Sequence, residues 1–149
     1  MQYSVRCSVA IHCMLVIALY SEEKRLTSQL LAKRAGCTAA TIRGILRQLQ
    51  DAELICVRRG TGGAFLNRDA SQITLWDIYR AVQPGEQESL RLHANPYPQC
   101  PVGKVIHQVL EEPYSRISDA MREQMQRYTL QMLLQRYAHM TEDENTTHA

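Results

Sequence analysis

Residues 26–66 read LTSQLLAKRAGCTAATIRGILRQLQDAELICVRRGTGGAFL, and this stretch decides the fold of the chain. Its first part predicts a short helix over residues 28–35, because Thr27 can act as the N-cap and Gly36 takes the left-handed conformation at low cost. Thr38 is the next N-cap candidate. Two helices joined by a tight turn that contains glycine predict a helix-turn-helix.

The second helix of this segment has one apolar side and one polar side. Its apolar residues recur at i, i+3, i+4 and i+7, which predicts a buried stripe. The stripe consists of Ile42, Ile45, Leu46 and Leu49. The other side combines small residues, which let a helix approach bases closely, with two arginines, which can read guanine or clamp phosphate. The predicted reading face consists of Thr38, Ala40, Thr41, Arg43 and Arg47.

Gly44 lies in the middle of this second helix. Glycine there costs about 1 kcal/mol relative to alanine, so its presence calls for a reason. A close approach of the helix backbone to DNA would supply one, and close packing against another helix would supply the other. The sequence favours neither explanation.

A hairpin follows the second helix directly. Residues 54–57 and 64–66 predict two short strands, because they flank a glycine-rich turn. A hairpin in this position is a wing, and its tip is basic. Backbone amides at glycines can reach phosphates, and a narrow loop can lie along a minor groove. The predicted wing contacts are Arg58, Arg59, Gly60, Thr61, Gly62 and Gly63.

Charge is unevenly placed along the chain, although the net charge is only +2. Residues 24–68 carry nine basic and two acidic side chains, whereas residues 69–149 carry seven basic and eleven acidic ones. The basic segment favours a polyanionic partner, and with the reading face and the wing it predicts binding to double-stranded DNA. The alternative is a winged helix used for protein contact. A steep loss of affinity with salt would distinguish the two.

The composition is that of a globular protein, with 45% apolar and 21% charged residues. The sequence holds no motif of a serine hydrolase, a zinc protease or a phosphate-binding loop, so we do not expect an enzyme. Its five cysteines are odd in number and form no CxxC pair, which favours a reducing cytoplasm. The apolar run at residues 9–19 is too short to span a bilayer, so it predicts a buried helix and no membrane partner.

Pattern and composition divide the chain into four segments. The predicted division is residues 1–83 as the winged helix-turn-helix domain, 84–101 as a proline-rich loop, 102–137 as a helical dimerisation region and 138–149 as a disordered tail. The heptad-like apolar steps of the third segment favour pairing with a second copy of the chain.

Two features subdivide the helical third segment. Pro113 falls inside its apolar series, and proline is tolerated only in the first turn of a helix. We therefore expect one helix to end near Leu110 and a longer one to begin near Pro113. Thr129 is a candidate cap for a final short helix.

Residues 26–65, with RRGTGGAF at the wing and ITLWDIYRAVQ after it, resemble the Rrf-two type of winged-helix regulators. The later segment NPYPQCPVGKVIHQVLEE is similar to a bacterial branch of that family with a single cysteine in CPVG at residues 100–103. The resemblance covers about residues 1–137. It implies a mainly α fold: a winged helix-turn-helix with a two-stranded wing and a long C-terminal dimerisation helix. It also implies a homodimeric regulator, in our interpretation a repressor, on a pseudo-palindromic operator.

The resemblance also bears on cofactors. Cluster-binding members of the family carry three closely spaced cysteines, where this chain has only Cys100. A two-iron cluster needs about four ligands, so we expect no cofactor and no iron–sulfur cluster. His93 and His107 flank Cys100 at seven residues on either side, which leaves a mixed metal site as the weaker alternative. An expected helix start beside Cys100 would stabilise a thiolate, so Cys100 is a candidate thiol sensor or small-ligand input. An inert packing cysteine is the competing interpretation.

Overall fold

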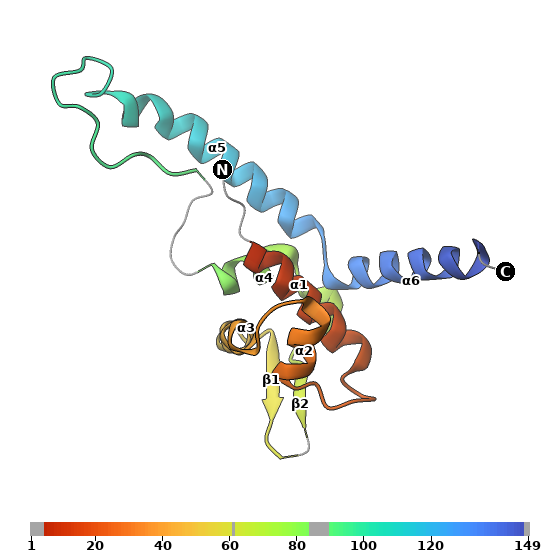
Figure 1. The fold of residues 1–149 in the computed structure, drawn as a ribbon. Helices are drawn as coiled ribbons and strands as arrows, with labels where there is room; N and C mark the ends of the chain where they lie inside the picture. Colours follow the sequence, from red (N-terminus) through yellow and green to blue (C-terminus); the bar gives the residue numbers. More distant parts are fainter. Residues whose placement is uncertain (1–4, 61, 84–89, 148–149) are drawn as a thin grey trace.

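The computed structural model describes residues 5–60, 62–83 and 90–147. The elements are α1 (Val5–Tyr20), α2 (Ser28–Ala35), α3 (Ala39–Asp51), β1 (Ile55–Arg58), β2 (Gly63–Leu66), a short 3-10 helix η1 (Ala70–Gln72), α4 (Leu75–Val82), α5 (Ile106–Arg127) and α6 (Leu130–Thr147). Figure 1 shows α1–α4 and the hairpin gathered into one body, from which α5 and α6 extend as two long helices. The chain is thus mainly helical, with a single two-stranded sheet among the described residues.

The predicted helix-turn-helix is confirmed, and its boundaries follow from local capping. The Thr27 side chain accepts a hydrogen bond from the backbone N–H of Leu30, and α2 ends at Gly36, whose φ of 69° is left-handed. The Thr38 side chain accepts from the N–H of Thr41 at the start of α3. Each cap satisfies a backbone group that the helix itself leaves unpaired, so the turn between α2 and α3 is set by residues within it.

The core forms where α1 packs against the helix-turn-helix. Ile42, Ile45 and Leu49 of α3 are fully buried, as the apolar stripe predicts, while Leu46 is half-buried. α1 contributes buried residues from one side of the helix, namely Ala10, Cys13, Met14, Val16 and Ile17. The apolar run at residues 9–19 is therefore a core helix. Within the part of the chain that is described, no helix has the length and apolar character needed to cross a membrane.

The hairpin has the predicted form of a wing. β1 and β2 pair antiparallel, with Ile55 opposite Leu66 at the base and Arg58 opposite Gly63 at the tip. The predicted contact Thr61 lies outside the described residues. So do residues 84–89 of the proline-rich loop, and residues 90–101 that follow contain no helix or strand.

The C-terminal helices return to the body at the start of α4. Thr74 and Asp77 form a reciprocal capping box there. Beside it, the N–H of Leu75 donates to the carbonyl of Tyr128 at 2.9 Å, and the N–H of Leu130 donates to the carbonyl of Ile73 at 2.8 Å. The Leu130 side chain is fully buried. The junction between α5 and α6 is thus attached to the core by a short backbone bridge and by Leu130, and the half-buried Leu134 of α6 packs against the same core.

Two expectations about the C-terminal region are wrong. α5 runs unbroken through Pro113, because that residue is exposed and water can solvate the carbonyl that loses its partner. α6 continues to Thr147, where a disordered tail was expected from residue 138. Thr129 caps α6 as predicted, by accepting from the N–H of Met132. No glycine or proline follows within α6, and extending a formed helix costs far less than nucleating one.

Candidate nucleic-acid interface

The predicted reading face of α3 is solvent-facing. Ala40, Arg43 and Arg47 are exposed on the side opposite the buried stripe, and Thr38 is exposed at the helix start. Thr41 is half-buried, and its hydroxyl lies 2.9 Å from the hydroxyl of Thr38. The small residues and the two arginines therefore share one accessible surface, which is the arrangement that a major groove requires.

A groove lies beside this face, between the start of α2, one side of α3 and the hairpin. Its lining includes four arginines from three parts of the chain: Arg25, Arg43, Arg47 and Arg58. None of the described residues that line it is acidic. Among the described residues, no carboxylate lies within ion-pair distance of these four guanidinium groups. We call this surface the arginine groove.

Arg25 is the member of the arginine groove that sequence reasoning missed. It belongs to the link between α1 and α2, far from the reading face in sequence, and was counted only as part of a basic segment. The packing of the hairpin against the start of α2 brings it beside Arg43 and Arg58. Four uncompensated positive charges in one groove produce a field that attracts a polyanion.

The wing tip combines exposed arginine with a tightly built turn. Arg59 and Gly60 are exposed. The guanidinium of Arg58 lies over the ring of Phe65, with 4.0 Å from its central carbon to the ring centroid, and this contact orients it. Gly63 has a left-handed φ of 91°, and a Cβ there would lie 2.9 Å from the backbone nitrogen of Leu26. Gly63 therefore has a structural reason besides its predicted DNA contact: it lets the hairpin pack on the start of α2.

Gly62 is restricted in a similar way. A Cβ at this position would lie 2.7 Å from the carbonyl oxygen of Arg58, across the hairpin. Only glycine fits there without a shift of backbone. DNA contacts from the wing glycines stay predictions, and the structure adds that two of them are required by the turn itself.

The structure gives the packing explanation for Gly44 a specific neighbour. The nearest group to a Cβ at this position is Nη2 of Arg6, at 3.1 Å. Arg6, on α1, donates to Oε1 of Gln48 on α3 from Nε at 3.0 Å and from Nη2 at 2.6 Å. The packing of Arg6 from α1 against α3 therefore supplies one reason for the glycine, and a close approach to DNA stays a prediction. Sequence reasoning assigned no role to Arg6 or Gln48, because nothing local links residues 42 positions apart.

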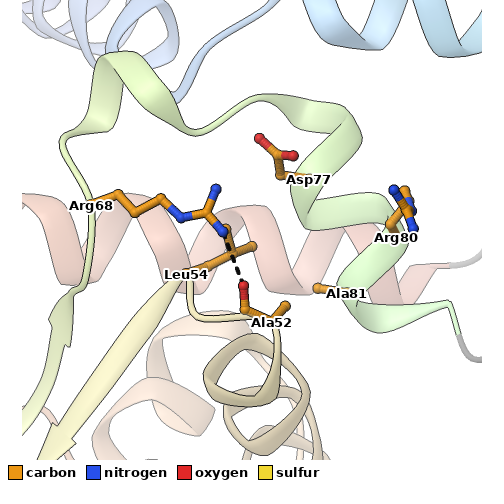
Figure 2. A pocket seen from close by; sticks show the side chains of 6 residues that line it. All are labelled: Ala52, Leu54, Arg68, Asp77, Arg80 and Ala81. Atoms are coloured by element: carbon orange, nitrogen blue, oxygen red, sulfur yellow. Dashed lines mark hydrogen bonds between the residues drawn. The ribbon is translucent and has the colours of Figure 1, made fainter.

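A second pocket lies on another side of the body, where α3 ends and α4 begins. It is lined by Ala52, Leu54, Arg68, Asp77, Arg80 and Ala81. Figure 2 shows the Arg68 side chain crossing from the loop after β2 to donate to the carbonyl of Ala52, at 3.1 Å. The Asp77 carboxylate is engaged by Thr74 in the capping box. Both polar groups therefore hold elements together and do not form a reactive centre.

Cys100 does not lie where the sequence predicts it. α5 begins at Ile106, so Cys100 is not at a helix N-terminus, and the expected stabilisation of a thiolate by helix dipoles is absent. The residue is half-buried in a series of turns. Its N–H donates to the carbonyl of Tyr97 at 3.1 Å, and its own carbonyl accepts from the N–H of Lys104 at 3.1 Å. Turns occupy residues 101–105, and α5 starts only after them.

The two histidines flanking Cys100 do come together. The ring centroids of His93 and His107 are 5.9 Å apart, and Nε2 of His107 lies 2.9 Å from the carbonyl oxygen of His93. That hydrogen bond uses one ring nitrogen of His107 and leaves Nδ1 as the other. Over the ranges the structure describes, no three histidine, cysteine or acidic side chains converge as metal ligands. The described residues of one chain therefore bring together fewer ligands than the about four that a two-iron cluster needs.

Comparison with known proteins agrees with the geometry. The profile of the Rrf2 family, described as iron-dependent transcriptional regulators, matches residues 3–136. YwnA of Bacillus subtilis (strain 168), named as a candidate HTH-type transcriptional regulator, is 33% identical over 120 residues, or 80% of this chain and 87% of YwnA. A solved structure of a candidate DNA-binding protein is 30% identical, with a TM-score of 0.71, over 87% of this chain and 98% of its own.

A further structure shows the same fold at lower identity. CymR, the global cysteine regulator of B. subtilis, is 21% identical, with a TM-score of 0.66, over 91% of this chain and 97% of CymR. The family and its members are regulators and not enzymes. Family profile, fold and basic groove agree: the chain belongs to the Rrf2 family and is a DNA-binding transcriptional regulator with a winged helix-turn-helix.

Proposed function

We propose that two copies of this chain pair through α5 and repress transcription at a pseudo-palindromic operator. One observation carries the pairing: α5 has 22 residues, and none of them is buried. Its apolar residues nevertheless recur along one side, and Ile117 and Val109 are 51% and 59% exposed. An amphipathic helix that leaves its apolar side in water gains free energy by burying it, and a second copy offers an identical stripe.

The pairing explains how a small winged helix-turn-helix domain recognises a specific DNA sequence. Each protomer would insert α3 into a major groove, with Arg43 and Arg47 toward the bases. Arg25, Arg58 and Arg59 would contact phosphates around it. Two such domains related by a two-fold axis bind two half-sites about one helical turn of DNA apart. The operator is therefore expected to be pseudo-palindromic.

The pairing is tested by adding a charge to α5. Ile117→Glu should raise the dimer dissociation constant by at least roughly tenfold, because it buries a carboxylate without a partner. Gln126→Glu adds the same charge to an exposed position on the opposite side of α5 and is the matched control. Sedimentation equilibrium measures both. If Ile117→Glu dimerises like the wild type, α5 is not the interface.

Repression is tested separately. A reporter promoter that contains an operator selected in vitro should lose expression when the wild-type protein is present and should keep it with Ile117→Glu. We expect repression because a dimer bound across a promoter excludes polymerase. Increased expression would assign the protein as an activator.

Cys100 is our proposed input. It lies half-buried in the turns that lead directly into α5, so a change at its sulfur would alter the start of the proposed dimer helix. In the simplest chemistry, hydrogen peroxide transfers one oxygen atom to the Cys100 sulfur, so that the thiolate becomes a sulfenate and the rest of the peroxide leaves as water. An iron input fits less well, because the described part of the chain brings no three histidine, cysteine or acidic side chains together. Visible absorption bands in protein purified without oxygen would overturn that preference.

A further inference from the structure

The contact between Arg6 and Gln48 fixes the chemistry that Gln48 can offer. A guanidinium group has donors only, so the amide atom that faces it must be the oxygen. Oε1 of Gln48 accepts both of the hydrogen bonds that Nε and Nη2 of Arg6 donate. The amide nitrogen keeps its two N–H donors, which no hydrogen bond among the described residues uses. Gln48 is thus an oriented donor.

The position of Gln48 on α3 separates it from the arginine groove. Arg43, which lines that groove, precedes it by five residues, which is a rotation of roughly 140° around the helix axis. Gln48 therefore lies on the flank of α3 that faces α1, and the wing lies toward the other flank. Gly44, one turn before Gln48 on the same flank, leaves the space that Nη2 of Arg6 occupies.

A major groove has a phosphate wall on each side. It is about 12 Å wide, close to the diameter of a helix with its side chains, so a helix inserted with its reading face toward the bases brings both flanks to the walls. The arginine groove serves the wall on the wing side. The other wall meets the flank that carries Gln48.

We propose that Gln48, oriented by Arg6, donates to a DNA backbone phosphate on the side of α3 away from the wing. A phosphate oxygen only accepts hydrogen bonds, so its partner must supply a donor. The Gln48 amide meets this requirement, because its nitrogen can donate while its oxygen is bonded to Arg6. Adenine is a poor match, because glutamine reads it with amide oxygen and nitrogen together. Arg6 is a positioning residue in this arrangement. The inference rests on DNA binding by α3.

Binding to two kinds of duplex tests the contact. One duplex carries an operator selected in vitro, and the other is a mixed-sequence duplex of the same length. Gln48→Met removes the donors and should weaken binding to both by the same factor, roughly fivefold per protomer. Gln126→Met makes the same change on α5 and should bind as the wild type does. A loss confined to the operator would mean a base contact and would overturn the proposal, as would no loss at all.

Gln48→Glu separates a binding role from a structural one. A carboxylate keeps an acceptor for Arg6, so the melting temperature should stay the same or rise, but it cannot donate to phosphate. Binding to both duplexes should fall further than in Gln48→Met, because the carboxylate also repels DNA. Wild-type affinity in this variant would overturn the proposal. This readout also remains if Gln48→Met fails to fold.

The positioning role of Arg6 has its own test. If Arg6 acts by orienting Gln48, then Arg6→Met should weaken binding in the wild-type background and change nothing further in the Gln48→Met background. Additive losses would show that Arg6 acts independently and would overturn the positioning role. If the wild-type protein binds neither duplex, DNA binding itself is contradicted. If the wild-type protein binds DNA and the Gln48 variants bind equally well, only the Gln48 contact is contradicted.

Discussion

Nη2 of Arg6 lies 3.1 Å from the point that a Cβ on Gly44 would occupy. The two residues belong to α1 and α3, so this contact forms where the Arg6 side chain of α1 packs against α3. Because the contacting atom is the far end of a flexible side chain, a methyl group could be accommodated if the guanidinium moved by a few tenths of an ångström.

The first prediction concerns Gly44→Ala. Alanine should stabilise α3 by about 1 kcal/mol through its helix propensity, but displacement of Arg6 should offset part of that gain. In an Arg6→Ala background the full gain should appear. Urea unfolding of the four proteins in this cycle measures both values. Equal gains in the two backgrounds would mean that Arg6 does not restrict position 44.

A second prediction distinguishes the reading face from the wing. Arg59→Ala should weaken binding to all sequences alike, because the exposed wing tip is placed to contact phosphate. Arg43→Ala should also relax base preference, at a cost of about 1–3 kcal/mol on the operator. Mobility shifts on the operator and on single-base variants of it measure both effects. If neither substitution changes the mobility shifts, Arg43 is not a base contact and Arg59 is not a phosphate contact.

Arg25 supplies a third prediction, which the structure alone suggests. The logarithm of the DNA affinity falls linearly with the logarithm of the salt concentration. Arg25→Ala should make this slope less steep by about one, because one phosphate contact is lost. Arg116→Ala removes an equally charged side chain from α5, where it pairs with Glu112, and is the matched control. An unchanged slope for Arg25→Ala would place Arg25 outside the interface.

Cys13 leads to a prediction about pH. Burial raises the pKa of its thiol to about 12 from the ordinary 9.0, and the nearby Cys37 thiol adds to the shift. The folded chain therefore holds this proton more tightly than the unfolded chain does. The resulting stability is fully present below pH 9.0 and is lost as the pH rises from 9.0 toward 12. In Cys13→Ala, the urea midpoint should fall less steeply above pH 9.0 than in the wild type.

The control for that experiment is Cys56→Ala, which removes a half-buried thiol from the hairpin. Its urea midpoint should follow the pH dependence of the wild type. If Cys13→Ala and the wild type lose stability in parallel above pH 9.0, the Cys13 thiol does not contribute to the pH dependence.

The last prediction concerns the proposed input. Treatment with hydrogen peroxide should change the operator affinity of the wild type and leave that of Cys100→Ser unchanged. Cys37→Ser is the comparison, because it removes another half-buried thiol near the helix-turn-helix. A peroxide effect that persists in Cys100→Ser would move the sensor to another residue.

The sequence by itself determined the helix-turn-helix and the wing. Thr27, Gly36 and Thr38 act on backbone groups only a few residues away, and the apolar stripe of α3 repeats with the period of the helix. Such signals are local, so they can be read before the chain is folded. The charged reading face followed, because it is the side of α3 that the stripe leaves exposed.

Only the tertiary structure decided what depends on distant contacts or on solvation. Arg25 joins the arginine groove, and Arg6 meets Gln48, because packing brings separate segments together. α5 passes through Pro113 because that position is exposed to water, which compensates the lost hydrogen bond. The local sequence pattern does not show which distant residues a side chain contacts or how exposed it is to water. Those two properties determine the parts of the structure that the sequence did not predict.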